Sequence, residues 1–167
     1  MYSINMSSIS AKIGSFISSN PSTVANMVRE KAEKIANEAG EQLVSCIRNA
    51  ISASGLNGGA IAAVGDVSST SAVELAPGKF QVDVSIDAQS RPSLVPDRYG
   101  GVDDMASLLD RGYSAGARVY GYWHGNYTGS LQQRDGAHFV QSGVDTFNAT
   151  YGGQYNAVAT IVSDRFG

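Results

Sequence analysis

The feature that most constrains the fold is a stripe of apolar side chains that recurs every three or four residues for about thirty residues. It follows the pair Asn20-Pro21, where Asn can cap free N–H groups and Pro occupies a position whose N–H has no helical partner. The spacing predicts one helix that continues to about Ser54 and spans roughly 50 Å, longer than a compact domain of this size needs. The stripe consists of Val24, Met27, Val28, Ile35, Ala39, Leu43, Cys46, Ile47, Ala50 and Ile51.

Apolar and polar residues alternate from residue 80 to residue 87, which predicts a strand with one buried face. Pro77-Gly78 precedes this strand, and a Pro with fixed φ followed by a Gly at positive φ is typical of a tight turn. With Val73 and Leu75 upstream, we expect an antiparallel hairpin. The buried positions of the strand would be Phe80, Val82, Val84 and Ile86.

Two segments before the hairpin are less regular. In residues 4–17, apolar side chains at helical spacing predict a short amphipathic helix weakened by its serines. Residues 55–71 are poor in charge and rich in Gly, Ala and Ser, which indicates a loop with a short strand at 61–64.

After the hairpin, the pattern predicts two helices and one strand. One helix lies within residues 102–109 and ends at Gly112. The other covers residues 138–151 and stops at the glycine pair 152–153. Residues 155–162 have the composition of a closing strand, which we expect to pair with the hairpin.

Together these elements predict an α+β fold, with a long N-terminal helix packed on a small antiparallel sheet and one or two further short helices. A length of 167 residues favours one domain. We place this domain at residues 20–167, and residues 1–19 form an N-terminal arm or short helix.

The composition narrows the functional classes. Only 16% of the residues are charged and the net charge is −3, which argues against a chain whose main work is neutralising nucleic-acid phosphates. Cys46 is the one cysteine, so an intrachain disulfide and a cysteine-built zinc site are excluded. No stretch has the length and apolarity of a membrane span, and no secretory signal is recognised, so we expect a soluble protein inside the cell that makes it.

The sequence offers little for catalysis. Its two histidines are His124 and His138, and no Gly-x-Ser-x-Gly turn accompanies them. An aromatic-flanked His more often fills a gap in the fold than it acts as a base. The glycines near residue 57 lack the Lys-Ser/Thr of a phosphate-binding loop. We therefore expect no enzyme activity, no metal and no cofactor.

Arginines and aromatic residues are interspersed between residues 91 and 134. Such a mixture binds single-stranded nucleic acid by stacking, but it is also the composition of protein-interface hot spots, and the acidic net charge favours the interface. For Trp123, burial in the core is an equally good explanation. The expected interface anchors are Tyr113, Tyr120, Tyr122, Trp123 and Arg134.

The C-terminal half contains four stretches that together resemble a known protein family. They read MASLLDRGY at 105–113, VYGYWHG at 119–125, RDGAHFV at 134–140 and VDTFN at 144–148. In these stretches the chain is similar to the small neck and tail-completion proteins of tailed bacteriophages, also described as minor capsid or tail-component proteins. By layout, the resemblance covers roughly residues 20–165.

The resemblance implies a structural virion protein of the neck or tail, made in the host cytoplasm. Its partners would be identical subunits in a ring, a portal-side adaptor and tail-tube or terminator proteins. DNA would pass through the lumen without specific binding, and no membrane would be involved. A ring also needs two different complementary patches on each subunit, which low charge and exposed aromatic residues would suit. A capsid-associated or decoration protein is the alternative, and a small hydrolase using His124 or His138 is a weaker one.

If Trp123 is an interface anchor, we expect Trp123→Ala to abolish self-assembly and leave a soluble, folded chain. Size-exclusion chromatography with circular dichroism measures both properties. Aggregation or loss of the folded spectrum would instead assign Trp123 to the core.

Overall fold

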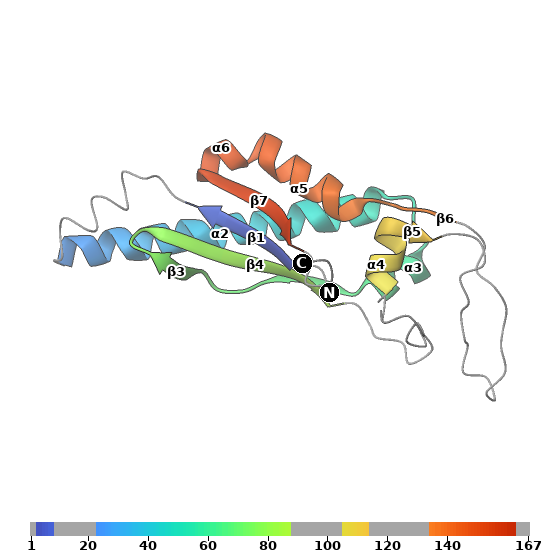
Figure 1. Ribbon diagram of the computed structural model, residues 1–167, viewed down its shortest axis with the longest axis horizontal. Helices are drawn as coiled ribbons and strands as arrows, with labels where there is room; N and C mark the ends of the chain where they lie inside the picture. The colour runs from blue at the N-terminus through green and yellow to red at the C-terminus, as the bar shows by residue number, and fades with distance from the viewer. Residues whose placement is uncertain (1–2, 9–22, 88–104, 114–133, 163–167) are drawn as a thin grey trace, which may run out of the picture.

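Two helices lie against one face of an antiparallel sheet (Figure 1). This arrangement comes from a computed structural model, which describes residues 3–8, 23–87, 105–113 and 134–162. The long helix is α2 (Thr23–Ala53), and α5 (Phe139–Thr150) packs beside it. The predicted α+β class and the long helix are therefore confirmed, although residues 20–22, where the helix was expected to start, lie outside the described ranges.

The sheet contains five strands in the order β2-β4-β1-β7, and β3 pairs with β4 beyond the end of β2. Every pairing in it is antiparallel. Its strands are β1 (Ser3–Ser8), β2 (Asp66–Ser69), β3 (Val73–Ala76), β4 (Lys79–Asp87) and β7 (Ala157–Val162).

The predicted hairpin is confirmed as β3 and β4. Ala76 pairs with Lys79 across the turn, and Gly78 has a φ of 72°, the conformation that the turn requires of its glycine. The alternate apolar residues of β4 are buried beneath the helices, whereas the polar residues between them are half-buried or exposed on the outer face. The buried set is Phe80, Val82, Val84 and Ile86.

The helix predicted for residues 4–17 is wrong over residues 4–8, which belong to the central strand β1. Ile4 is fully buried there, and β1 pairs with β4 on one side and with β7 on the other. Pairing on both sides gives the backbone N–H and C=O groups of β1 their hydrogen-bond partners. A helix over these serine-rich residues would be only weakly stable, so the strand is favoured. Because β1 lies between them, the closing strand β7 pairs with β1 and not with the hairpin as expected.

Helix α2 approaches the sheet closely at one glycine. A Cβ built on Gly40 would lie 2.6 Å from Cγ1 of Val82. The contact therefore uses the absence of a side chain to bring the helix backbone down onto β4. Gly40 is thus a point of close contact between helix and sheet.

A second glycine sets the distance between the two helices. A Cβ on Gly143 of α5 would lie 2.8 Å from the Cα of Ile47 on α2, and both residues are buried. The predicted helix over 138–151 is confirmed, but the glycine pair after it does not end helical structure. Gly152 instead begins the short helix α6 (Gly152–Tyr155), whose Tyr155 ring stacks on Phe147 with centroids 6.5 Å apart.

The short strand predicted at 61–64 is also wrong. Residues 58–64 form the helix α3 (Gly58–Val64), and the strand β2 starts two residues later. The side chain of Asn57 accepts a hydrogen bond from the N–H of Ala60 at 2.8 Å, which is an N-cap. The alanines that follow favour a helix, and this local preference exceeds the weak strand signal of one Ile and one Val.

The helix predicted at 102–109 is confirmed over its described part as α4 (Met105–Arg111), and it ends at Gly112 with a φ of 79°. The two residues that follow α4 form the strand β5 (Gly112–Tyr113). It pairs with β6 (Arg134–Asp135) in a separate two-stranded sheet. Residues 88–104, between β4 and α4, lie outside the described residues.

Substituting Gly143 tests the contact between the helices. Gly143→Ala places a methyl group against the Ile47 backbone, which cannot rotate away, so we expect the free energy of unfolding to fall by about 1–3 kcal/mol. Urea denaturation measures it. Gly153→Ala is the matched control, because nothing lies within 4 Å of a Cβ there. Equal stability of the two variants would contradict the proposed packing.

Candidate interface

The two ends of the Tyr- and Gly-rich segment are held side by side. Strands β5 and β6 are antiparallel, with Tyr113 opposite Arg134 and Gly112 opposite Asp135. Two of the five expected anchors are thus brought together in the backbone although 20 residues separate them in the chain. The other three, Tyr120, Tyr122 and Trp123, lie outside the described residues.

The two-stranded sheet of β5 and β6 is fixed to the start of α5 by Asp110, which is 6% exposed. Its carboxylate accepts a hydrogen bond from the N–H of Val140 at 2.9 Å, and its backbone carbonyl accepts one from the N–H of His138 at 2.9 Å. A carboxylate at a helix N-terminus satisfies a free donor and is favoured by the helix dipole. Asp110 therefore caps α5 from a distant part of the chain.

Gly136 permits that cap. A Cβ on Gly136 would lie 2.5 Å from the carbonyl oxygen of Asp110 and 2.6 Å from the carbonyl carbon of Arg111. Any side chain would push β6 away from the end of α4 and break the hydrogen bonds to Asp110. The Gly in the RDGAHFV stretch is thus required by a close backbone approach.

Of the two histidines considered for catalysis, the structure describes His138. His138 is exposed, holds a left-handed φ of 49°, and makes no side-chain hydrogen bond to cap α5. His124 lies outside the described residues. Within the described ranges, no group of three or more His, Cys, Asp or Glu side chains is placed to hold a metal ion.

Cys46 belongs to the core of α2 and is 4% exposed. Burial raises the pKa of its thiol, and a hydrogen bond with Gln42 opposes that shift. A thiol kept protonated in an apolar site is a weak nucleophile. Cys46 is therefore best explained as a small packing residue.

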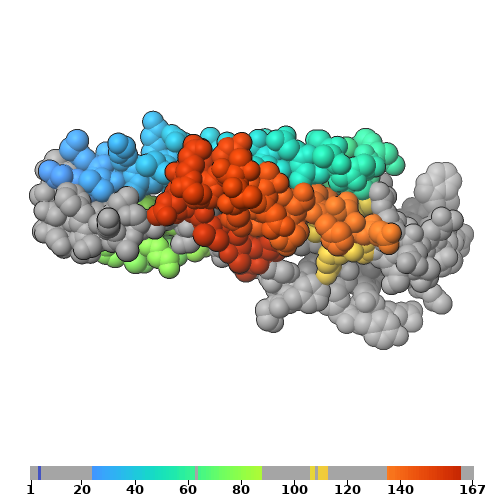
Figure 2. Space-filling view, turned by 90° about the horizontal axis from the view of Figure 1, so that it is seen from above, coloured from blue at the N-terminus to red at the C-terminus, as the bar shows by residue number. Residues whose placement is uncertain are grey.

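A different surface stands out at the end of the molecule where α2 begins. The first turns of α2 extend beyond α6, so that α5 and α6 cover only the later part of the helix (Figure 2). The β3–β4 turn lies at the same end (Figure 1). We call this region the projecting end and define it as residues 24–33 of α2 with residues 73–78 of the hairpin.

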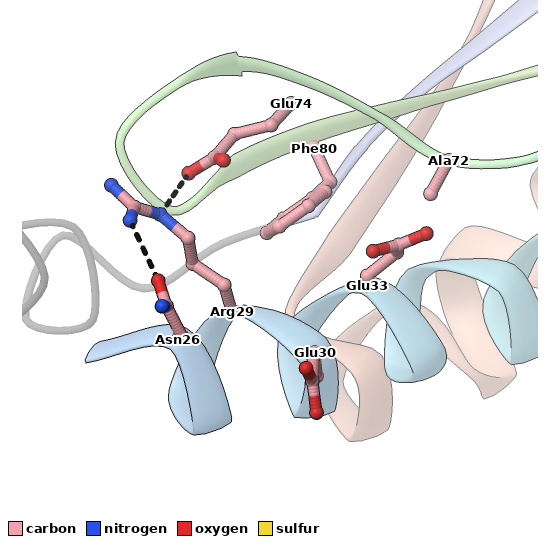
Figure 3. A pocket seen from close by; sticks show the side chains of 7 residues that line it. All are labelled: Asn26, Arg29, Glu30, Glu33, Ala72, Glu74 and Phe80. Atoms are coloured by element: carbon pink, nitrogen blue, oxygen red, sulfur yellow. Dashed lines mark hydrogen bonds and ion pairs between the residues drawn. The ribbon is translucent and has the colours of Figure 1, made fainter. Parts of the chain in front are cut away.

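Arg29 and Glu74 hold the projecting end together. Nε of Arg29 lies 3.2 Å from Oε1 of Glu74 (Figure 3). The same oxygen accepts a hydrogen bond from the N–H of Gly78 at 2.8 Å. The carboxylate thus ties α2 to the hairpin turn. A pocket of about 300 Å³ opens beside this pair, over Phe80 and Glu33. Because Arg29 is already paired with Glu74, the pocket presents mainly carboxylates.

The projecting end carries apolar side chains on two opposite faces. On α2, Val24 and Met27 are 52% and 64% exposed, and Met27 lies about 200° around the helix axis from Arg29, away from the sheet. On β3, Val73 and Leu75 are 58% and 56% exposed. They alternate with Glu74, which faces the helix, and so they lie on the outer face of the sheet. We name the pairs the helix patch and the strand patch.

Neither patch was recognised from the sequence. Val24 and Met27 were assigned only to the apolar stripe of the long helix, and both are exposed. Met27 lies on the side of α2 that faces away from the sheet, where later residues such as Lys34 and Glu41 are exposed as well. Val73 and Leu75 were assigned only to the hairpin. The available signal was the length of the helix, since a span of roughly 50 Å leaves part of the stripe without a partner.

Helix side chains cover backbone groups at both outer edges of the sheet. The amide of Asn148 on α5 donates to the carbonyl of Ala159 at 3.0 Å and accepts its N–H at 2.8 Å, which occupies the outer edge of β7 at that residue. On the other edge, Nη2 of Arg48 donates to the carbonyl of Val67 on β2 at 2.7 Å. Edges covered in this way resist pairing with a strand of another molecule.

Comparisons of the chain with protein-family models, with curated proteins and with solved structures give no match. Among the described helices, none combines the length and the apolar character needed to cross a bilayer. The functional argument therefore depends on the surfaces described above.

Removing the Asp110 cap tests how strands β5 and β6 are anchored to the start of α5. We expect Asp110→Ala to lower the free energy of unfolding by about 1–3 kcal/mol, because the Val140 N–H loses its acceptor in a buried site. Asp110→Asn keeps an oxygen at that position and should lose less. Thermal unfolding and amide exchange at Val140 measure the effect, and unchanged exchange in the Ala variant would refute the cap.

Proposed function

We propose that this chain is a structural subunit of an oligomeric ring in a tailed bacteriophage, at the head–tail connector or tail-completion position. The observation that carries the proposal is the clustering of exposed apolar residues. Of the five large apolar side chains that are exposed among the described residues, four belong to the projecting end. Exposed apolar side chains gathered at one end of a molecule are a feature of protein interaction sites.

The placement of these residues fits a ring better than a two-fold dimer. A subunit of a cyclic ring meets one neighbour through one patch and the other neighbour through a different patch. The helix patch and the strand patch lie on opposite faces of the same end, as such a subunit requires. A two-fold dimer would need only one self-complementary patch.

The covered sheet edges support contact through side chains. With Ala159 and Val67 bonded to helix side chains, strand addition at those positions would first have to break hydrogen bonds within the chain. Contact between the faces of the projecting ends breaks no hydrogen bond within the chain. At Val67 and Ala159, contact between faces is therefore favoured over the addition of a strand from another copy.

The finer assignment to the neck or tail is supported by the resemblance of the C-terminal half to phage neck and tail-completion proteins. Neighbouring rings would be a portal-side adaptor and tail-tube or terminator proteins, and DNA would cross the lumen without specific binding. We propose the Tyr-rich segment, whose ends meet at Tyr113 and Arg134, as the contact with those neighbours.

The oligomeric state of the purified chain tests the proposal. We expect light scattering to give a mass several times 17.5 kDa, and Met27→Lys to shift the particle toward the monomer because a charge would be buried at the contact. Val158→Lys is the matched control, since Val158 is 63% exposed against 64% for Met27 but lies on β7.

A monomer at all concentrations would contradict the ring. Labelled chain located in purified virions by electron microscopy separates the neck from the capsid shell, where a decoration protein would lie. Hydrolysis of a substrate that is lost in His138→Ala would favour an enzyme instead.

A further inference from the structure

The sequence contains one Asn-Gly pair, Asn57-Gly58, and it lies at the start of α3 (Figure 1). Both residues are exposed, and a Cβ built on Gly58 would meet nothing within 4 Å. Gly58 is the first residue of α3, so its N–H has no partner within the helix. The nitrogen that follows Asn57 is therefore accessible to solvent and is shielded by no side chain of its own residue.

This pair has a reaction of its own, because asparagine is a thermolabile residue whose side-chain amide a backbone nitrogen can attack. The Gly58 N–H gives its proton to hydroxide, and the nitrogen forms a bond to Cγ of Asn57. The bond from Cγ to the side-chain nitrogen breaks, and that nitrogen takes a proton from water and leaves as ammonia. Water then opens the resulting succinimide ring at one of its two carbonyls, which yields aspartate or isoaspartate.

The N-cap of α3 opposes ring closure. Closure needs the Gly58 nitrogen nearly eclipsed with the Cβ of Asn57, whereas the ψ of 164° at Asn57 rotates it well away from that arrangement. The hydrogen bond from the Ala60 N–H to Oδ1 of Asn57, at 2.8 Å, holds the side chain in the capping position. The ring therefore forms only when the first turn of α3 opens and this hydrogen bond breaks.

The first turn of α3 has little else to hold it closed. Residues 57–59 are all exposed, and two of them are glycines, which are among the weakest helix formers. The helix is fixed instead by Leu56 before it and Val64 at its end, both of which are buried. The turn can thus open locally while the core stays folded.

We propose that Asn57 is a site of spontaneous deamidation and that the N-cap of α3 sets the rate. The two products act differently on the helix. Aspartate keeps an acceptor for the Ala60 N–H and adds a negative charge that the helix dipole favours. Isoaspartate adds a methylene to the backbone, which displaces the acceptor and removes the cap. Because α3 packs on α4, the isoaspartate product loosens that contact as well.

Peptide mass spectrometry of the folded chain, incubated at mildly alkaline pH, tests the site. Trypsin releases residues 49–79 as one peptide, because no Lys or Arg lies between Arg48 and Lys79. We expect conversion of amide to acid at Asn57, which fragment ions distinguish from conversion at Asn49. Asn49 is the internal control, since it is also exposed but is followed by Ala within α2.

Two variants separate the reaction from the cap. Gly58→Ala should slow the conversion at least about fivefold, because a Cβ shields the attacking nitrogen and Ala stabilises the helical turn relative to Gly. Ala60→Pro removes the N–H that Asn57 accepts, in a first turn that tolerates proline, and should speed the conversion about fivefold, the usual effect of one N-cap on an opening equilibrium. Circular dichroism shows whether each variant is folded, and the wild-type chain unfolded in guanidinium chloride should convert fastest.

The outcomes decide both parts of the proposal. Conversion at Asn57 and not at Asn49, slowed in Gly58→Ala and accelerated by unfolding, supports it. If Asn57 keeps its amide in the folded chain over the time in which the unfolded chain converts completely, the site is wrong. Equal rates in the folded chain, in Ala60→Pro and in the unfolded chain would overturn control by the cap.

Discussion

The close packing of α2 against both the sheet and α5 is the constraint on which the structure depends. Gly40 lets the helix backbone reach Val82 on β4, and Gly143 lets α5 reach the backbone of Ile47. Both contacts use the absence of a Cβ, so neither can be replaced by a larger apolar residue without moving an element. They fix the sheet and the two helices as one unit, with Leu43 and Phe147 fully buried.

That packing also determines which surface is left for partners. Helices α5 and α6 lie over the later part of α2, whereas Val24 and Met27 in its first turns are exposed. The Arg29–Glu74 pair ties this uncovered helix to the hairpin, so that two apolar patches face opposite ways on one support. An exposed pair of this kind contributes little to stability, and its effect here is on position.

Elements with strong local patterns could be predicted from the sequence. The stripe of α2, the alternation in β4 and the Pro-Gly turn are signals within one segment, and each identified the right element. The errors at β1 and α3 have a different cause. Strand β1 is stabilised by pairing with β4 and β7, which are distant in the chain, and α3 depends on a cap by Asn57 that composition alone did not reveal. The candidate patches could not be located either, since the exposure of Met27 and Val73 depends on which faces of α2 and of the sheet the other elements cover.

Paired cysteines test most directly whether unlike faces of neighbouring copies meet. The natural Cys46 is buried, so cysteines introduced as Met27→Cys and Leu75→Cys are the accessible thiols among the described residues. Oxidation of the double variant should give a ladder of disulfide-linked multimers, whereas either single variant should stay monomeric on denaturing gels. Dimers from a single variant, or no ladder from the double variant in an assembled sample, would contradict the account.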